Sequence, residues 1–196
     1  MYLQTFFEPK LDLERLRATL DTCGTWARIN AVRTLTPAQM KVLFEGCADA
    51  EPLSLDYMVP AGEALVEVIH HGKNSLPVFS HFQKRFCRPD GEDSPDQLWG
   101  YNHNGGVQMA VTGPGYFVTT LTEKGEVLVD YAKVPPRKPA SWPAIMGPTA
   151  RAGSLVWAGM TDVLRRVSDH VTIGAAYKNG KPMGQYFALC REDPKA

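Results

Sequence analysis

The chain has 196 residues, of which 44% are hydrophobic and 21% charged, and its basic and acidic side chains are equal in number. This length and composition are typical of one globular domain, so we expect a single domain over residues 1–196. The formal charge of zero at pH 7 provides no global field to attract nucleic acid or an anionic membrane. A nucleic-acid partner is therefore not expected.

The N-terminus and the uncharged stretches carry neither a secretory signal nor a membrane span. Residues 1–10 lack a basic region followed by a long apolar run. The stretch 107–121 is interrupted by polar residues, glycine and proline well before it reaches the ~20 apolar residues of a membrane span. These features predict a cytoplasmic protein. The four cysteines have no paired short spacing, which predicts reduced thiols in or near the core: Cys23, Cys47, Cys87 and Cys190.

Residues 1–50 are expected to form a helical layer of two helices. Leucines recur at helical spacing over Leu11–Leu20, and Gly24 follows as a stop signal. The sequence Thr-Pro-Ala-Gln at 36–39 offers a cap, a proline at the first helical position and a glutamine placed to close a capping box.

Residues 53–131 are expected to form an antiparallel meander, because short alternating runs are separated by turn signals. The expected strands are Leu53–Val59, Glu63–His71, Val78–Arg88, Leu98–His103, Val107–Thr112, Tyr116–Leu121 and Glu126–Tyr131. The sequence Glu-Lys-Gly at 123–125 suits a three-residue hairpin loop.

Residues 132–148 contain five of the fifteen prolines, so this segment cannot enter the interior of a sheet or helix. It also carries Trp142 and Ile145, which should be buried against another part of the chain. We expect a long ordered loop packed over one end of the sheet, acting either as a connector or as a lid.

Residues 149–191 are expected to form a long helix and a hairpin. Between Thr149 and His170, apolar residues share one helical stripe, so the helix should lie across the sheet. Val171–Tyr177 and Met183–Cys190 alternate on either side of Asn179-Gly180, which predicts a β-hairpin.

These elements add up to an α+β fold: an antiparallel β meander with two N-terminal helices, one long helix in the C-terminal half packed on the sheet, and a final β-hairpin. A curved antiparallel sheet covered by a long helix is similar in outline to helix-grip and other small-molecule-binding α+β folds. The hairpin after the long helix departs from their order of elements, so the likeness concerns the outline of the fold alone.

A candidate pocket follows from pairing the expected strands 63–71 and 78–88 as a hairpin. In the register that pairs Val68 with His81, small apolar side chains face a row of polar ones that could hold a ligand: His70, His81, Gln83 and Arg85. A solvated sheet surface would show the same alternation, and a shift of one residue would reverse the faces.

A second candidate cluster lies in the segment 99–106. Tyr101 and His103 share a face and could offer a hydroxyl and an imidazole to one ligand, although Asn104-Gly105-Gly106 also suits a plain tight turn. Nucleotide phosphate-binding and serine-nucleophile motifs are absent, so no cofactor is expected. No metal site is expected, since adjacent His70 and His71 would point to opposite faces of a strand.

The leading hypothesis is a protein that binds a partly apolar molecule, which could be anionic, between the sheet and the helix or the proline-rich loop. Arg85 would pair with the anionic group, His81 or His70 would donate hydrogen bonds, and the apolar walls would come from Trp99, Tyr101 and Trp142.

Two alternatives from other classes stay open. A cofactor-independent enzyme would use the same pocket, with Tyr101 as the acid and a histidine as the general base: His70, His81 or His103. A non-enzymatic interaction or regulatory protein would instead show an exposed apolar patch and a stable oligomer such as a homodimer.

Overall fold

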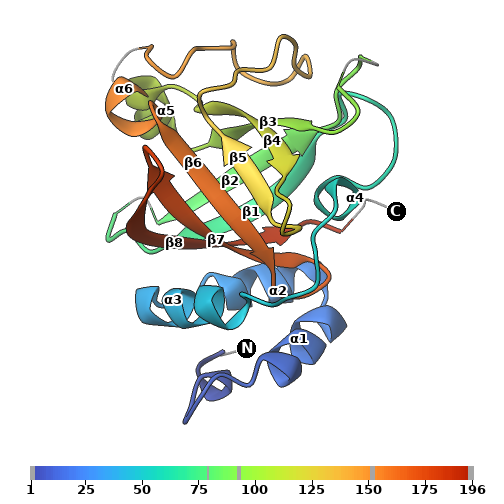
Figure 1. Ribbon diagram of the computed structural model, residues 1–196, viewed down its shortest axis with the longest axis vertical. Helices are drawn as coiled ribbons and strands as arrows, with labels where there is room; N and C mark the ends of the chain where they lie inside the picture. The colour runs from blue at the N-terminus through green and yellow to red at the C-terminus, as the bar shows by residue number, and fades with distance from the viewer. Residues whose placement is uncertain (1–2, 79, 92–93, 151–152, 194–196) are drawn as a thin grey trace.

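The structure of the chain, a computed structural model, describes residues 3–78, 80–91, 94–150 and 153–193 (Figure 1). These residues contain eight strands, each paired antiparallel with the next, and the last strand returns to pair with the first. The strands are β1 (Val68–Asn74), β2 (His81–Cys87), β3 (Leu98–His103), β4 (Tyr116–Leu121), β5 (Val127–Asp130), β6 (Met160–Arg166), β7 (Val171–Lys178) and β8 (Lys181–Arg191). The sheet is therefore a closed up-and-down barrel.

The expected α+β fold is wrong, because no long helix covers the sheet among the described residues. The segment expected to be helical, Thr149–His170, contains the short helix α6 (Gly153–Val156) and the strand β6, while residues 151 and 152 lie outside the described part of the chain. Strand β6 pairs with both β5 and β7. The apolar residues of this segment have helical spacing, but their pairing with two neighbouring strands makes the segment a strand. The chain therefore does not have the outline of a helix-grip fold.

Two other segments expected as strands are helical. Residues 55–58 of the expected strand Leu53–Val59 form α4 (Leu55–Met58), capped by the Ser54 side chain, and Val107–Thr112 lies within α5 (Gly106–Thr112). The bounds of β3 and β4 agree with the prediction, and the terminal hairpin of β7 and β8 is confirmed.

The N-terminal region is helical as expected, but its described residues form three α-helices where the pattern indicated two, and a short 3-10 helix besides. A 3-10 helix, η1 (Gln4–Phe6), precedes α1 (Leu13–Thr22), α2 (Thr25–Val32) and α3 (Pro37–Gly46). The capping box at the start of α3 is confirmed, with Thr36 and Gln39 exchanging side-chain to backbone hydrogen bonds. Helices α2 and α3 lie beside β7 and β8, below the barrel in Figure 1, and α1 lies farther from the barrel.

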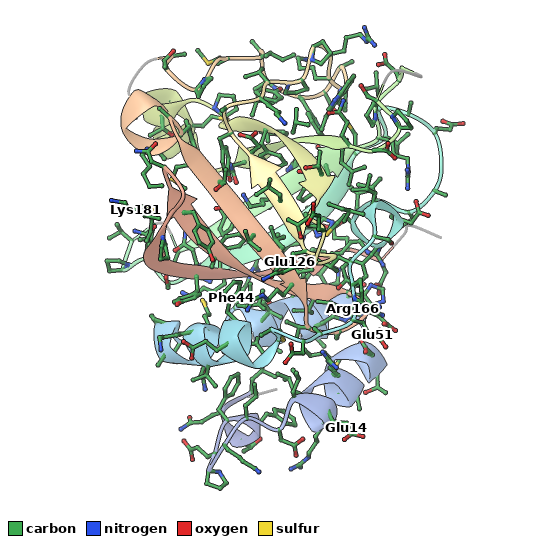
Figure 2. The ribbon with its side chains drawn as sticks, in the orientation of Figure 1. Glu14, Phe44, Glu51, Glu126, Arg166 and Lys181 are labelled. Atoms are coloured by element: carbon green, nitrogen blue, oxygen red, sulfur yellow. The ribbon has the colours of Figure 1, made fainter. Side chains whose placement is uncertain are left out.

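The barrel has two unlike ends. The connections β1–β2, β3–β4, β5–β6 and β7–β8 meet at one end, which we call the open end, and α4 lies with the remaining connections at the closed end. Figure 2 shows Lys181, at the tip of the β7–β8 hairpin, and Arg166, at the end of β6, on opposite sides of the molecule. At the closed end Arg166 pairs with Glu51 at 2.8 Å.

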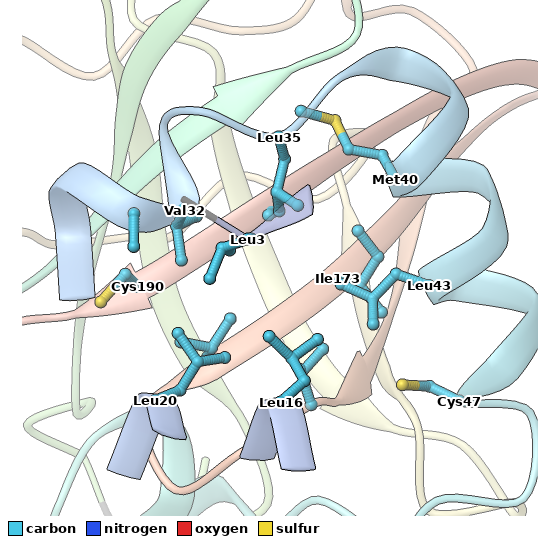
Figure 3. Close-up of a cluster of buried hydrophobic side chains, with 14 of the residues drawn as sticks. Leu3, Leu16, Leu20, Val32, Leu35, Met40, Leu43, Cys47, Ile173 and Cys190 are labelled. Atoms are coloured by element: carbon cyan, nitrogen blue, oxygen red, sulfur yellow. The ribbon is translucent and has the colours of Figure 1, made fainter. Parts of the chain in front are cut away.

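Buried side chains form three hydrophobic clusters, one inside the barrel and two on its outer wall. The cluster in Figure 3 joins the N-terminal helices to the outer face of β7 and β8, with Leu16 and Leu43 opposite Ile173. A second cluster fills the closed half of the barrel around Phe86, Phe117 and Leu164. The third attaches the proline-rich loop to the outer wall; its buried members are Cys87, Trp99, Tyr101, Tyr116, Val118 and Trp142.

Three glycines make room for phenylalanine rings inside the barrel. Each is the cross-strand partner of one ring, in the pairs Gly72 with Phe82, Gly100 with Phe117 and Gly174 with Phe187. A Cβ at Gly174 would lie 2.3 Å from the Phe187 ring, closer than real Cβ contacts allow. The interior therefore accepts these rings only because the opposite position has no side chain.

We expect Gly174→Ala to lower the free energy of unfolding by about 2 kcal/mol, because the added methyl group overpacks the barrel against Phe187. Urea denaturation measures the effect. Gly147→Ala is the control, since no atom outside its chain neighbours lies within 4 Å of its Cβ position. The double variant Gly174→Ala/Phe187→Leu should be less destabilised than the sum of the two single variants, and strict additivity would contradict the packing argument.

Candidate functional site

The open half of the barrel contains a cavity of about 330 Å³. At ~30 Å³ per molecule, this is the volume of roughly ten waters. Its walls are mostly apolar and are formed by Phe82, Val156, Trp157, Met160, Met183 and Phe187. The Trp157 ring is held in place by a 2.9 Å hydrogen bond from Nε1 to the Thr112 carbonyl oxygen and by stacking on Tyr131, with ring centroids 5.1 Å apart. The cavity thus has the shape and lining of a site for one small molecule.

A polar cluster lies at the inner end of this cavity, where Lys84 and Asp162 form an ion pair. Their Nζ and Oδ2 atoms are 2.9 Å apart, and the two side chains are only 2% and 4% exposed. Lys84 comes from β2 and Asp162 from β6, on opposite sides of the barrel. The pair therefore crosses the barrel interior.

Tyr131 and Asn102 complete the polar cluster. Lys84 Nζ donates to Asn102 Oδ1 at 3.0 Å and also to the Tyr131 hydroxyl oxygen. Tyr131 Oη donates to Asp162 Oδ2 at 2.9 Å and accepts from Asn102 Nδ2 at 3.0 Å. Asn102 Nδ2 also lies 3.2 Å from the Gly115 carbonyl oxygen. All three protons of the ammonium group have acceptors, so the buried charge is fully hydrogen-bonded.

Burial shifts the acid–base properties of the polar cluster. It lowers the pKa of the Lys84 ammonium, while the charge and hydrogen bond of Asp162 act in the opposite direction. Burial raises the pKa of the Tyr131 phenol well above its ordinary value, and the Asp162 charge adds to that rise. Aromatic rings of Phe117 and Phe187 stand 5.0 and 5.2 Å from Lys84 Nζ, which favours the cationic form. The phenol therefore stays protonated and acts as a hydrogen-bond donor at neutral pH.

Asn104 is a further polar residue of the cavity lining. It follows β3 in the β3–β4 connection and is 7% exposed. Its Nδ2 is shielded from solvent and has no hydrogen-bond partner. An amide nitrogen in this state is costly unless something supplies an acceptor.

Six of the residues predicted from the sequence come together, but on the outside of the barrel. Strands β2 and β3 align them as cross-strand neighbours, and the proline-rich loop adds the last: Gln83 with His103, Arg85 with Tyr101, Trp99, and Trp142. We call these six residues the outer cluster. The prediction placed these residues between the sheet and either the long helix or the proline-rich loop. In the structure they lie on the outer wall of the barrel, where Trp142 of that loop packs against them.

The polar groups of the outer cluster largely bind one another. Arg85 donates to Glu67 at 3.1 Å and to Gln83 at 2.7 Å, and Trp142 Nε1 donates to Glu67 at 2.6 Å. Tyr101 Oη lies 3.2 Å from His103 Nδ1, and His103 lines an outer pocket of about 530 Å³ beside α5. Burial raises the pKa of Tyr101 and lowers that of His103. Through its hydrogen bond to Glu67 and its packing in this cluster, Trp142 attaches the loop 132–148 to the outer wall of the barrel.

The two remaining predicted residues lie apart from this outer cluster. The register pairs Val68 with Phe86, so the expected pairing of Val68 with His81 is wrong. Because the difference is an odd number of residues, His70 points into the barrel while His81 stands exposed on its outside. His70 Nε2 lies 2.8 Å from the Met58 carbonyl oxygen, at the closed end of the barrel and away from the cavity.

The residues of the polar cluster were not predicted from the sequence, although one signal pointed to Lys84. It shares an alternation with Phe82 and Phe86, so a single lysine occupies the apolar face of a strand. Nothing in the sequence pointed to Asp162. Its segment also fits the apolar stripe of a helix, and in such a helix the aspartate is expected to face solvent.

Breaking the Lys84–Asp162 pair from one side should cost about 3–5 kcal/mol of unfolding free energy, because the partner is left as an uncompensated buried charge. We expect Lys84→Met and Asp162→Asn each to show this loss, and the double variant to recover about 2 kcal/mol relative to their sum. Urea denaturation provides the three values. The exposed pair Lys41–Glu45 is the control and should show much weaker coupling. Additive effects at Lys84 and Asp162 would contradict a buried ion pair.

The stability of the protein should fall as the pH drops below 6.5, in part because of His70. Burial lowers its pKa from 6.5 to about 3, so between these values the unfolded chain binds a proton that the folded chain does not. His70→Gln retains a donor for the Met58 carbonyl and removes this proton. Between pH 7.5 and pH 5, unfolding free energies should fall by about 2 kcal/mol more in the parent than in His70→Gln. An equal fall in both proteins would show that His70 is not buried in its neutral form.

Comparisons with protein-family models, with curated proteins and with solved structures give no match for this chain. Within the described residues, no group of three or more histidine, cysteine, aspartate or glutamate side chains is placed to hold a metal ion. None of the described helices has the length and apolar character needed to cross a membrane. The functional inference therefore depends on the cavity and its own residues.

Proposed function

We propose that this protein binds one small, largely apolar molecule inside the barrel, in the cavity whose inner end is formed by the polar cluster. The observation that carries this proposal is the cavity itself, in which apolar walls surround the polar cluster of Lys84, Asp162, Tyr131 and Asn102. Sites for small molecules combine apolar walls with a few placed polar groups in this way.

The division of the barrel interior supports the proposal. The closed half is filled by side chains and plugged by Met58 and Val59, which are at most 3% exposed. The open half contains the cavity, whose lining includes the small side chain of Ala176. A barrel of this size encloses either a packed core or one small ligand. In this barrel the closed half is a packed core, and the open half has space for a small ligand.

The outer pocket beside His103 supports a second candidate, acid–base catalysis without a cofactor. The specific observation is the contact of 3.2 Å between Tyr101 Oη and His103 Nδ1 at the edge of that pocket. An imidazole and a phenol in contact can relay a proton between a substrate and solvent. The two candidates place the bound molecule on opposite sides of the barrel wall, so they predict different effects of filling each space.

The test uses 2-acetylnaphthalene and 2-naphthoate as probes and isothermal titration calorimetry as the measurement. Ala176 lines the barrel cavity and Ala144 lines the outer pocket, so Ala176→Phe and Ala144→Phe fill one space each with the same side chain. We expect one molecule of at least one probe to bind per chain, with affinity reduced at least about tenfold by Ala176→Phe and unchanged by Ala144→Phe.

The reverse pattern would contradict binding in the barrel and favour the outer pocket. Binding of neither probe would also contradict the proposal, provided that circular dichroism shows the parent protein to be folded. Thermal denaturation of both variants shows whether a loss of binding reflects the filled space or a loss of folding.

A further inference from the structure

The charge balance of the cavity bears on which ligands it can take. Lys84 and Asp162 carry one positive and one negative charge within a wholly buried contact. The other charged residue of the lining, Lys178, is half-buried at the end of β7 and donates to the Val156 carbonyl oxygen at 3.3 Å. The inner end of the cavity is therefore electrically neutral, and an additional buried charge would have no counterion there.

The hydrogen-bond donors of the polar cluster are also in use. The ammonium protons of Lys84 are taken by Asp162, Asn102 and Tyr131, and the Tyr131 hydroxyl proton by Asp162. A carboxylate entering the cavity would meet the Asp162 carboxylate and would find no free proton in this cluster. At the inner end it would lose its hydration without gaining charged hydrogen bonds in return, and Lys178 at the end of β7 is, among the described residues, the one cation of the lining that is not paired with Asp162.

Asn104 differs from the polar cluster because its donor is free. It lines both the cavity and the outer pocket, more than nine-tenths of its surface is buried, and its Nδ2 has no partner among the described residues. Nδ2 is shielded in this rotamer, so a rotation of the side chain that turns it toward the cavity would let a neutral acceptor oxygen of a ligand satisfy that amide. Such a contact adds free energy of binding without adding charge.

From these three observations we infer that the ligand is an uncharged, largely apolar molecule with an acceptor oxygen, such as a ketone, aldehyde or ester, which accepts a hydrogen bond from Asn104. This inference rests on the proposed function and narrows it to a chemical class. It also makes Asn104 the residue that selects for the acceptor oxygen, while the Lys84–Asp162 pair disfavours anions.

Three bicyclic compounds of matched size separate the contributions: 2-acetylnaphthalene carries a neutral acceptor, 2-isopropylnaphthalene carries none, and 2-naphthoate carries a charge at pH 7. Equilibrium dialysis gives the affinity of each for the parent protein and for Asn104→Leu. His103→Gln, which changes the neighbouring side chain on the outer wall, is the matched control.

We expect the ketone to bind the parent at least about tenfold more tightly than the carboxylate. In Asn104→Leu, the affinity for the ketone relative to the hydrocarbon should fall about three- to tenfold, the effect of one neutral hydrogen bond. Unchanged affinity for the hydrocarbon shows that the variant cavity is intact. His103→Gln should leave all three affinities unchanged.

Two results would overturn the inference while leaving barrel binding in place. One is tighter binding of 2-naphthoate than of 2-acetylnaphthalene, which would show that the cavity accepts an anion. The other is an unchanged ratio of ketone to hydrocarbon in Asn104→Leu, which would show that Asn104 does not contact the acceptor oxygen. Failure of all three compounds to bind would overturn the proposed function and the inference together.

Discussion

The ion pair between Lys84 and Asp162 is the interaction on which the rest of this structure depends. Bringing two charges out of water costs several kcal/mol per ion, so the pair is tolerated only with close geometry and further hydrogen bonds. Tyr131 and Asn102 supply those bonds, at 2.9 Å to Asp162 and 3.0 Å from Lys84. Because the residues come from strands on different sides of the barrel, the cluster forms only when the sheet closes.

The pair also divides the interior of the barrel. On one side, the rings of Phe86 and Phe117 and helix α4 fill the space, with Gly100 placed opposite Phe117. On the other side lies the cavity, and Lys84 and Asp162 form its inner end. A hydrophobic pair of the same volume would often stabilise such a protein as well or better. Stability alone therefore does not require a charged pair here; under the proposed function, the pair limits the charge of the molecule that the cavity accepts.

How much could be predicted from the sequence differs between local and long-range features. The capping box at Thr36, the turn at Asn179-Gly180 and the bounds of β3 and β4 depend on neighbouring residues, and all agree with the structure. Barrel closure depends on β1 meeting β8 across more than a hundred residues, which no local pattern reveals. Residues 160–166 satisfy both a helical stripe and a strand alternation, so only that closure decides between them.

The same limit applies to the candidate site. Alternation placed Gln83 and Arg85 on one face of their strand and Tyr101 and His103 on one face of theirs, because side chains alternate by the geometry of a strand; the structure joins the two sets as cross-strand neighbours. Alternation did not show whether these faces lie inside or outside, since the answer depends on the register of β1 and on the curvature of the closed sheet. Asp162 and Lys84 are 78 residues apart in the sequence, and only the folded barrel brings them into contact.

The most direct measurement is a crystal structure of the protein soaked with 2-acetyl-6-bromonaphthalene, in which anomalous scattering locates the bromine. The account predicts a bromine peak inside the barrel between Phe82, Trp157 and Phe187, with the carbonyl oxygen within hydrogen-bonding distance of Asn104 Nδ2. A peak in the outer pocket beside His103, or a barrel interior filled by side chains where the cavity is described, would contradict it.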